Sequence, residues 1–193
     1  MSVINGDSFE LNIAKSMPSF AFKFKIKALP DHSRVVSEVT VSRPDKPSWK
    51  QTLTVSGMTP VPEKLKFFFG AVDINYDGHN DFFLATRQGT ANSYVDYWLF
   101  VPSKQEFSYL GNYPIFTLDP KSKTLSTFER GGYGGMIFKR NRYRFIKGSL
   151  TLTESVEQVE TGREGVFLRK ILKIKKGKLR LVKTEMIKTP EGR

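Results

Sequence analysis

The stretch from Asp73 to Asp81 has the residue types and spacing of a calcium-binding loop. Oxygen-bearing side chains stand at positions 1, 3, 5 and 9 of the stretch, and Gly78 stands at position 6. Calcium takes about six to eight oxygen ligands, and this alternation turns three side chains and a backbone carbonyl toward one point. The carbonyl belongs to His79, whose side chain is expected to face water. Gly78 allows a sharp turn. The predicted metal site comprises Asp73, Asn75, Asp77, His79 and Asp81.

The flanking residues indicate strands on both sides of this loop. An EF-hand has a bidentate Glu at position 12, where this chain has Leu84. The segments 67–72 and 82–85 are short apolar runs, which are typical of buried strands. The pattern therefore predicts a strand–loop–strand site. A turn without metal is the alternative, because Asp, Asn and Gly favour turns in any case.

A glycine-rich segment later in the chain has the character of a contact loop. Four glycines surround Tyr133 between Gly131 and Gly135, so the chain can bend sharply there and approach another backbone closely. Tyrosine has few rotatable bonds and one polar group, as interface anchors do. The alternative is a long turn whose Tyr133 folds back on the protein's own surface. Both interpretations stay open from the sequence.

The residue types favour a protein without catalytic activity. The chain has no cysteine, which excludes disulfides and thiolate chemistry, and its two histidines are His32 and His79. His32 lies in a turn-like tetrad, and no HExxH, P-loop or GxGxxG-before-helix pattern occurs. A hydrolase with paired Asp/Glu in a cleft is a competing hypothesis, because such pairs converge only in three dimensions.

Positive charge gathers in the C-terminal third of the chain. Residues 1–135 contain 15 Lys+Arg and 13 Asp+Glu, whereas residues 136–193 contain 16 and 6. Such asymmetry fits an anionic envelope polymer or lipid, or a solvated strand face. Nucleic acid is not favoured, because strand periodicity in 138–147 puts Arg142 and Arg144 on one face and Tyr143 and Phe145 on the other, whereas single-strand binders combine both on one surface.

Short alternating strands separated by turns predict an all-β fold of antiparallel sheets built from successive hairpins, as a sandwich or a propeller-like arrangement. The hairpin 143–152 recurs as 172–181, with Gly148 and Gly177 in the two turns, an offset of 29 residues (177 − 148). Short stretches near 60–65 and 155–160 are the candidates for a helical turn. We predict an N-terminal lead over 1–18 and a single β-domain over 19–193. No signal peptide or apolar membrane span is visible.

Several segments resemble one protein family. Residues 72–81 resemble the calcium loop of FG-GAP-like repeats. The chain is further similar to lysozyme-inhibitor-like immunity proteins, which accompany secreted peptidoglycan-hydrolase effectors and share the fold of periplasmic inhibitors of invertebrate-type lysozyme. The resemblance spans roughly residues 35–185 and rests on segments in the same order, at 51–53, 96–99, 114–126, 130–132 and 143–145.

The resemblance implies a non-enzymatic protein that plugs the active-site cleft of a lysozyme-like peptidoglycan hydrolase. In that family a loop with an aromatic residue enters the cleft, and Tyr133 is the candidate here. Glu129 or Arg130 would reach the catalytic carboxyl of the enzyme or its neighbours. The implied location is the periplasm, with the cytoplasm as the alternative, and calcium would act structurally. The implied partner-binding residues are Glu129, Arg130, Gly131, Gly132, Tyr133 and Gly134.

Overall fold

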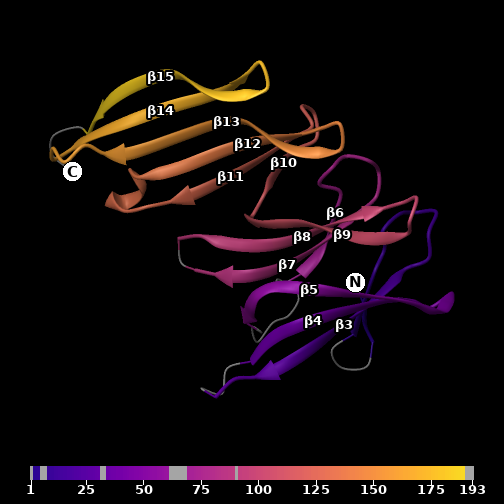
Figure 1. Ribbon diagram of the computed structural model, residues 1–193. Coiled ribbons are helices and arrows are strands. Elements are labelled where there is room, and N and C mark those ends of the chain that lie inside the picture. The colour runs from indigo at the N-terminus through magenta and orange to yellow at the C-terminus, as the bar shows by residue number, and fades with distance from the viewer. Residues whose placement is uncertain (1, 5–7, 31–33, 61–68, 90, 190–193) are drawn as a thin grey trace. The chain divides into compact units, whose positions relative to one another are not determined.

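The computed structural model describes residues 2–4, 8–30, 34–60, 69–89 and 91–189 (Figure 1). The described chain is built from antiparallel strands, which confirms the predicted all-β class. It divides into two compact units: residues 1–89 and 93–113 form unit 1, and residues 90–92 and 114–193 form unit 2. The single domain expected over 19–193 stays a prediction, since two compact units can still fold as one domain.

Unit 1 contains two sheets. The five-stranded sheet runs in chain order through β1 (Ser2–Ile4), β2 (Ser8–Leu11), β3 (Phe20–Ala28), β4 (Arg34–Arg43) and β5 (Lys46–Pro60). The four-stranded sheet runs through β6 (Phe69–Val72), β7 (Asp81–Gln88), β8 (Ser93–Val101) and β9 (Glu106–Pro114). Both are meanders, as alternating strands joined by short turns predict.

Phenylalanines from both sheets form the core of unit 1. Phe22 of β3 stacks on Phe82 of β7 with ring centroids 4.5 Å apart, and Phe20 meets Phe100 of β8 edge-on at 5.6 Å. All four rings are buried. Such pairs add to the stabilisation from burial. Unit 1 is therefore a β-sandwich closed by interlocking aromatic rings.

The described part of the N-terminal segment belongs to this sandwich. β2 pairs with β3, and Phe9, Leu11 and Ile13 are buried. Residues 8–13 of the predicted N-terminal lead over 1–18 therefore pack within the sandwich. The alternation of Phe9 and Leu11 is too short to identify a strand from sequence, since it needs β3 beside it to bury both side chains.

Unit 2 is one six-stranded meander. Its strands, in spatial and chain order, are β10 (Thr117–Asp119), β11 (Thr124–Arg130), β12 (Phe138–Ile146), β13 (Ser149–Glu160), β14 (Val166–Lys175) and β15 (Lys178–Lys188). The repeated hairpins are β12–β13 and β14–β15, which lie in the same sheet and not in separate blades. Residues 155–160 belong to β13, so the helical turn considered there is wrong. The other candidate, 60–65, lies outside the described residues except for Pro60.

The predicted alternation on β12 is confirmed. Arg142 and Arg144 are exposed, whereas Tyr143 and Phe145 are partly buried. Tyr143 meets Phe116, and its register partner on β11, Leu125, is fully buried. Among the described residues, no helix has the length and apolar character needed to cross a membrane.

Candidate functional site

The loop between β6 and β7 turns its oxygen-bearing side chains inward. The Asp73 carboxylate accepts hydrogen bonds from the backbone N–H of Asp77 (3.1 Å) and of Gly78 (2.9 Å). The Asn75 Oδ1 accepts from the same Asp77 N–H at 3.0 Å, so two candidate ligand oxygens meet at one point. Asp77 in turn accepts from the N–H of His79 at 2.8 Å.

Gly78 makes the sharp turn that the sequence predicts. Its φ is +90°, a conformation that costs glycine little and other residues more. No atom lies within 4 Å of the position that a Cβ would take there, so the backbone conformation and not lack of space is the constraint. Tyr76, at position 4, also has a positive φ of 61°.

Asp81, at position 9, is a fully buried acid at the base of the loop. Its oxygens accept from the N–H of Ile74 (3.0 Å) and of Phe100 on β8 (2.9 Å). The pKa of Asp81 is raised to about 7, chiefly by burial; the charges of Asp77 and Asp73 also contribute to this rise, and the two N–H bonds oppose it. A cation at the loop would relieve this mutual repulsion.

The His79 side chain faces water only in part. It is 26% exposed, and its Nδ1 lies 3.2 Å from the Asp77 Oδ1. Its ring lies 5.7 Å from that of Phe100. The His79 side chain therefore lies between the loop and Phe100 of β8.

The loop supplies oxygen donors, which suit a hard cation such as calcium. In the part of the chain that the structure describes, no group of three or more His, Cys, Asp or Glu side chains is arranged to hold a metal. The donors of this loop include the amide of Asn75, and each carboxylate oxygen that accepts an N–H keeps a second lone pair. The chemistry of the donor set fits calcium, and calcium binding stays a prediction.

Asp96 on β8 is not part of this loop. It is fully buried, and its carboxylate accepts from Ser56 N (2.8 Å), Tyr109 Oη (3.1 Å) and Asn112 Nδ2 (2.8 Å). These bonds join β5, β8 and β9, so Asp96 ties the two sheets of unit 1 together.

The glycine-rich loop joins β11 to β12 in unit 2 and forms a tight turn. Tyr133 (φ 55°) and Gly134 (φ 62°) are its central residues, and the N–H of Gly135 donates to the carbonyl of Gly132 at 3.2 Å. With Gly135 (φ 91°), three consecutive residues have a positive φ, which Gly or Asn normally takes, and they form the short 3₁₀ turn η2 (Tyr133–Gly135). Gly131 has a different reason, because a Cβ there would lie 2.5 Å from the Ile137 Cγ2.

The buried Gln158 and the partly exposed Arg169 fix the base of this loop. Gln158 on β13 is 1% exposed, and its Nε2 donates to the carbonyl of Met136 at 2.6 Å. Its Oε1 accepts from Arg169 Nε on β14 at 2.9 Å. The Arg169 guanidinium lies 5.8 Å from the ring of Phe138, the first residue after the loop. Side chains of β13 and β14 thus anchor the C-terminal end of the loop to the sheet.

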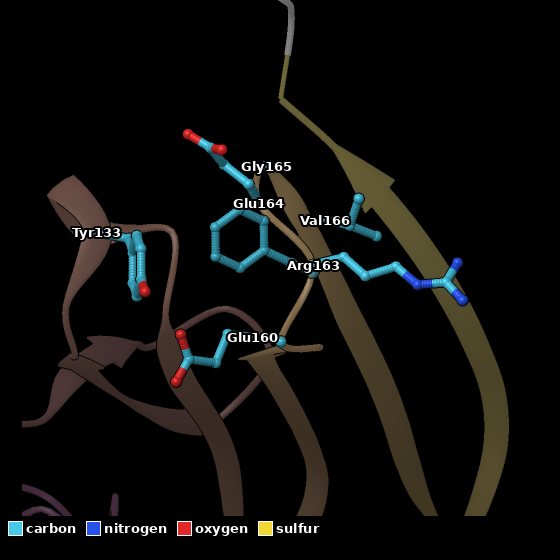
Figure 2. Close-up of a pocket in the computed structure, with 8 residues that line it drawn as sticks. Tyr133, Glu160, Arg163, Glu164, Gly165 and Val166 are labelled. Atoms are coloured by element: carbon cyan, nitrogen blue, oxygen red, sulfur yellow. The ribbon is translucent and has the colours of Figure 1, made fainter.

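Tyr133 projects from the loop and is 65% exposed. Its ring meets Phe167 of β14 edge-on at 5.9 Å, and a hydrogen bond to the Glu160 carboxylate raises the pKa of its hydroxyl. Figure 2 shows the hydroxyl turned toward Glu160, while Arg163 extends away from the ring. These residues line a pocket of about 380 Å³ together with Glu164. Tyr133 contacts its own sheet and still exposes most of its ring, and its role as an interface anchor stays a prediction.

The strand register separates the two charged residues before the loop. Four residues stand side by side across neighbouring strands and therefore share one face of the sheet: Arg130, Phe138, Gln158 and Arg169. Glu129 pairs with Lys139 and points to the opposite face. Phe167 lies two residues from Arg169 on the face of Arg130. The structure therefore groups Arg130, and not Glu129, with Tyr133.

Sequence reasoning missed Gln158, Glu160, Arg169 and Phe167, which come from two later strands. No local pattern marks them, since only the β12–β13–β14 register brings them to the loop. Gly132 and Gly134 lie where predicted, in the turn itself.

One solved structure resembles the whole chain. It is described as "Structure of a Xanthomonas Type IV Secretion System related protein", and it superposes with a TM-score of 0.61 at 14% identity, covering 94% of this chain and 96% of that chain. The likeness shows a shared fold. No protein-family model and no curated protein matches the chain. This protein is thus similar in fold to a secretion-system-related protein.

Proposed function

We propose that this protein is a non-catalytic immunity protein that inhibits a lysozyme-like peptidoglycan hydrolase. The rigid loop that presents Tyr133 is the observation that carries the proposal. A tyrosine 65% exposed, in a backbone conformation unfavourable for it, persists only where the surroundings hold it in place. Gln158 and Arg169 do so here, which lowers the entropy lost when a partner binds.

The loop has the composition that a sugar-binding cleft accepts. The Tyr133 ring offers a flat apolar surface, and Arg130 adds a cation on the same face of the sheet, able to pair with a catalytic carboxylate. Arg130 is exposed, and its guanidinium lies 6.0 Å from the Phe128 ring, which orients it. The similarity in fold to a Xanthomonas protein related to a type IV secretion system supports an association with bacterial secretion. The periplasm, where peptidoglycan is cleaved, is the proposed location.

Calcium would serve unit 1 as a structural ion in this proposal. Asp73, Asn75, Asp77 and Asp81 would hold it, with the His79 carbonyl. The ion would offset the repulsion among three carboxylates and join β6 to β7 at their shared loop.

The test measures peptidoglycan lysis by lysozyme-like muramidases, beginning with any encoded beside this gene, with increasing amounts of the protein. Inhibition should saturate at equimolar protein. Tyr133→Ala should weaken it by about 10–1000-fold, the range of a hot-spot residue, whereas Tyr133→Phe should keep most of it. Leu181→Ala is the matched control, because Leu181 is 56% exposed on β15 of the same unit. Full inhibition by Tyr133→Ala would reject this loop as the inhibitory element.

A further inference from the structure

The meander of unit 2 brings three hairpin turns to one end of the sheet. Successive antiparallel strands reverse direction, so the turns after β10, β12 and β14 share one end, and the Tyr133 loop lies at the other. Figure 1 shows the β12–β13 and β14–β15 turns on the same side. We call this end the lysine end and define it by residues 119–124, 146–149 and 175–178.

Each of the three turns carries a lysine in a left-handed conformation. Lys123, Lys147 and Lys176 have φ of 50°, 50° and 50°. Glycine or asparagine is the usual residue there, because at positive φ a Cβ lies too close to the following carbonyl oxygen, and asparagine can compensate by local hydrogen bonds. All three side chains are exposed, and so are those of the neighbouring Lys121, Lys175 and Lys178. The same unfavourable choice in three turns indicates a function for the side chains.

The positive charge at the lysine end is largely uncompensated. The three hairpins, over residues 117–126, 142–154 and 173–180, contain ten Lys+Arg and two Asp+Glu. Of these two acids, Glu154 pairs with Lys173 and Arg142, and Asp119 accepts bonds from the N–H groups of its own turn. Among the described residues, none of the ion pairs involves the six lysines of the lysine end.

Exposed aliphatic side chains lie beside these lysines. Ile146 is 44% exposed, Leu179 37% and Leu181 56%. Nucleic-acid binders without sequence preference place aromatic rings among their cations to stack bases, and the large exposed hydrophobics of these hairpins are aliphatic. Aliphatic side chains beside lysines are typical of surfaces that enter the headgroup region of a bilayer.

We propose that the lysine end binds the surface of an anionic phospholipid bilayer. The three turns project from one end of a sheet, so their lysines can reach phosphate groups at the same time, while the neighbouring aliphatic side chains contact the acyl boundary. This leaves the Tyr133 loop at the opposite end of the sheet. The proposal does not depend on the inhibitor function.

The test is cosedimentation of the full chain with phosphatidylglycerol–phosphatidylcholine vesicles and with phosphatidylcholine vesicles. We expect binding to the anionic vesicles only, and weaker binding as salt rises. The triple variant Lys123→Asn, Lys147→Asn and Lys176→Asn should bind about 100-fold more weakly, since each lysine near the surface is worth about a fivefold change in affinity. Asparagine tolerates a positive φ, so the fold should persist, as circular dichroism would check.

The control removes the same charge from unit 1 by Lys23→Gln, Lys25→Gln and Lys27→Gln, at three exposed positions of β3. It should bind almost as the native chain does. If both triple variants lost the same affinity for the anionic vesicles, net charge alone would explain the binding, and the proposal would be overturned. Equal binding to neutral vesicles would also overturn the proposal. The same holds if a single-stranded oligonucleotide binds more tightly than the vesicles through the same lysines.

Discussion

At the scale of single residues, Asp81 makes the stability of unit 1 depend on pH. Its pKa rises from 3.8 to about 7, mainly through burial. Between these values the folded protein holds a proton that the unfolded chain has lost. The contribution of Asp81 is therefore most favourable below about pH 4 and declines as the pH rises to about 7. Above that, folding must bury the charge, and a bound cation would offset the cost.

Calcium should accordingly stabilise the protein more at pH 8 than at pH 5. At pH 5 Asp81 is protonated, so the loop has less negative charge to attract the ion. Thermal unfolding with calcium and with EDTA at both pH values measures this. The variant Asp81→Asn should lose most of the difference between the two pH values. An equal calcium effect at pH 5 and pH 8 in the native chain would contradict the role of Asp81.

Thr127 on β11 offers a stabilising substitution. It is 2% exposed, and its Oγ1 is buried without a hydrogen-bond partner among the described residues. Burying an unpaired hydroxyl costs about 1–3 kcal/mol, whereas a methyl group of similar size costs nothing there. Thr127→Val should raise the free energy of unfolding by about 1 kcal/mol in chemical denaturation. Thr86→Val is the control. Thr86 Oγ1 accepts a hydrogen bond from Asn112, so its removal should lower the free energy of unfolding.

At the scale of elements, hairpins were predictable and their partners in space were not. The turns at 102–104 and 119–123, the hairpins at Gly148 and Gly177 and the strands beside the calcium-type loop follow from local patterns. Local pattern also located Tyr133. The residues that support it could not be found this way, because Gln158 and Arg169 meet the loop only through strand register. The sequence likewise gives no sign that His79 packs beside Phe100.

Gln158 should matter both to stability and to the loop. Gln158→Leu leaves the Met136 carbonyl and the Arg169 Nε without this partner, so the free energy of unfolding should fall by about 1–3 kcal/mol. Inhibition of the hydrolase should weaken as well, because the Tyr133 loop loses its anchor.

Gln51→Leu is the matched control for that prediction. Gln51 likewise donates one hydrogen bond and accepts one in unit 1, both with the backbone of Phe107: its Nε2 donates to the carbonyl (2.6 Å) and its Oε1 accepts from the N–H (2.8 Å). It should cost similar stability and leave inhibition unchanged below the unfolding temperature. If Gln158→Leu and Gln51→Leu inhibited the hydrolase equally, the hydrogen bonds of Gln158 would not position Tyr133.

At the scale of the whole molecule, the calcium-type loop and the other two candidate sites fall in different compact units. The calcium-type loop belongs to unit 1, and the Tyr133 loop and the lysine end belong to unit 2. Unit 1 has an aromatic core of its own. The side chains that hold the Tyr133 loop come from β12, β13 and β14 and, at Arg130, from Asn92, which also belongs to unit 2. Support for the inhibitory loop is therefore local to unit 2.

Because the calcium-type loop and the Tyr133 loop belong to different units, removing calcium should lower stability and leave inhibition nearly unchanged. EDTA, or the double variant Asp73→Asn and Asp77→Asn, should lower the unfolding temperature, because the cation no longer offsets the charges around Asp81. Inhibition at 25 °C should remain within about twofold of the native value, since Gln158 and Arg169 still hold the loop. If inhibition disappears while circular dichroism shows a folded protein, the metal loop governs Tyr133 across the two units, and the local account of the inhibitory loop fails.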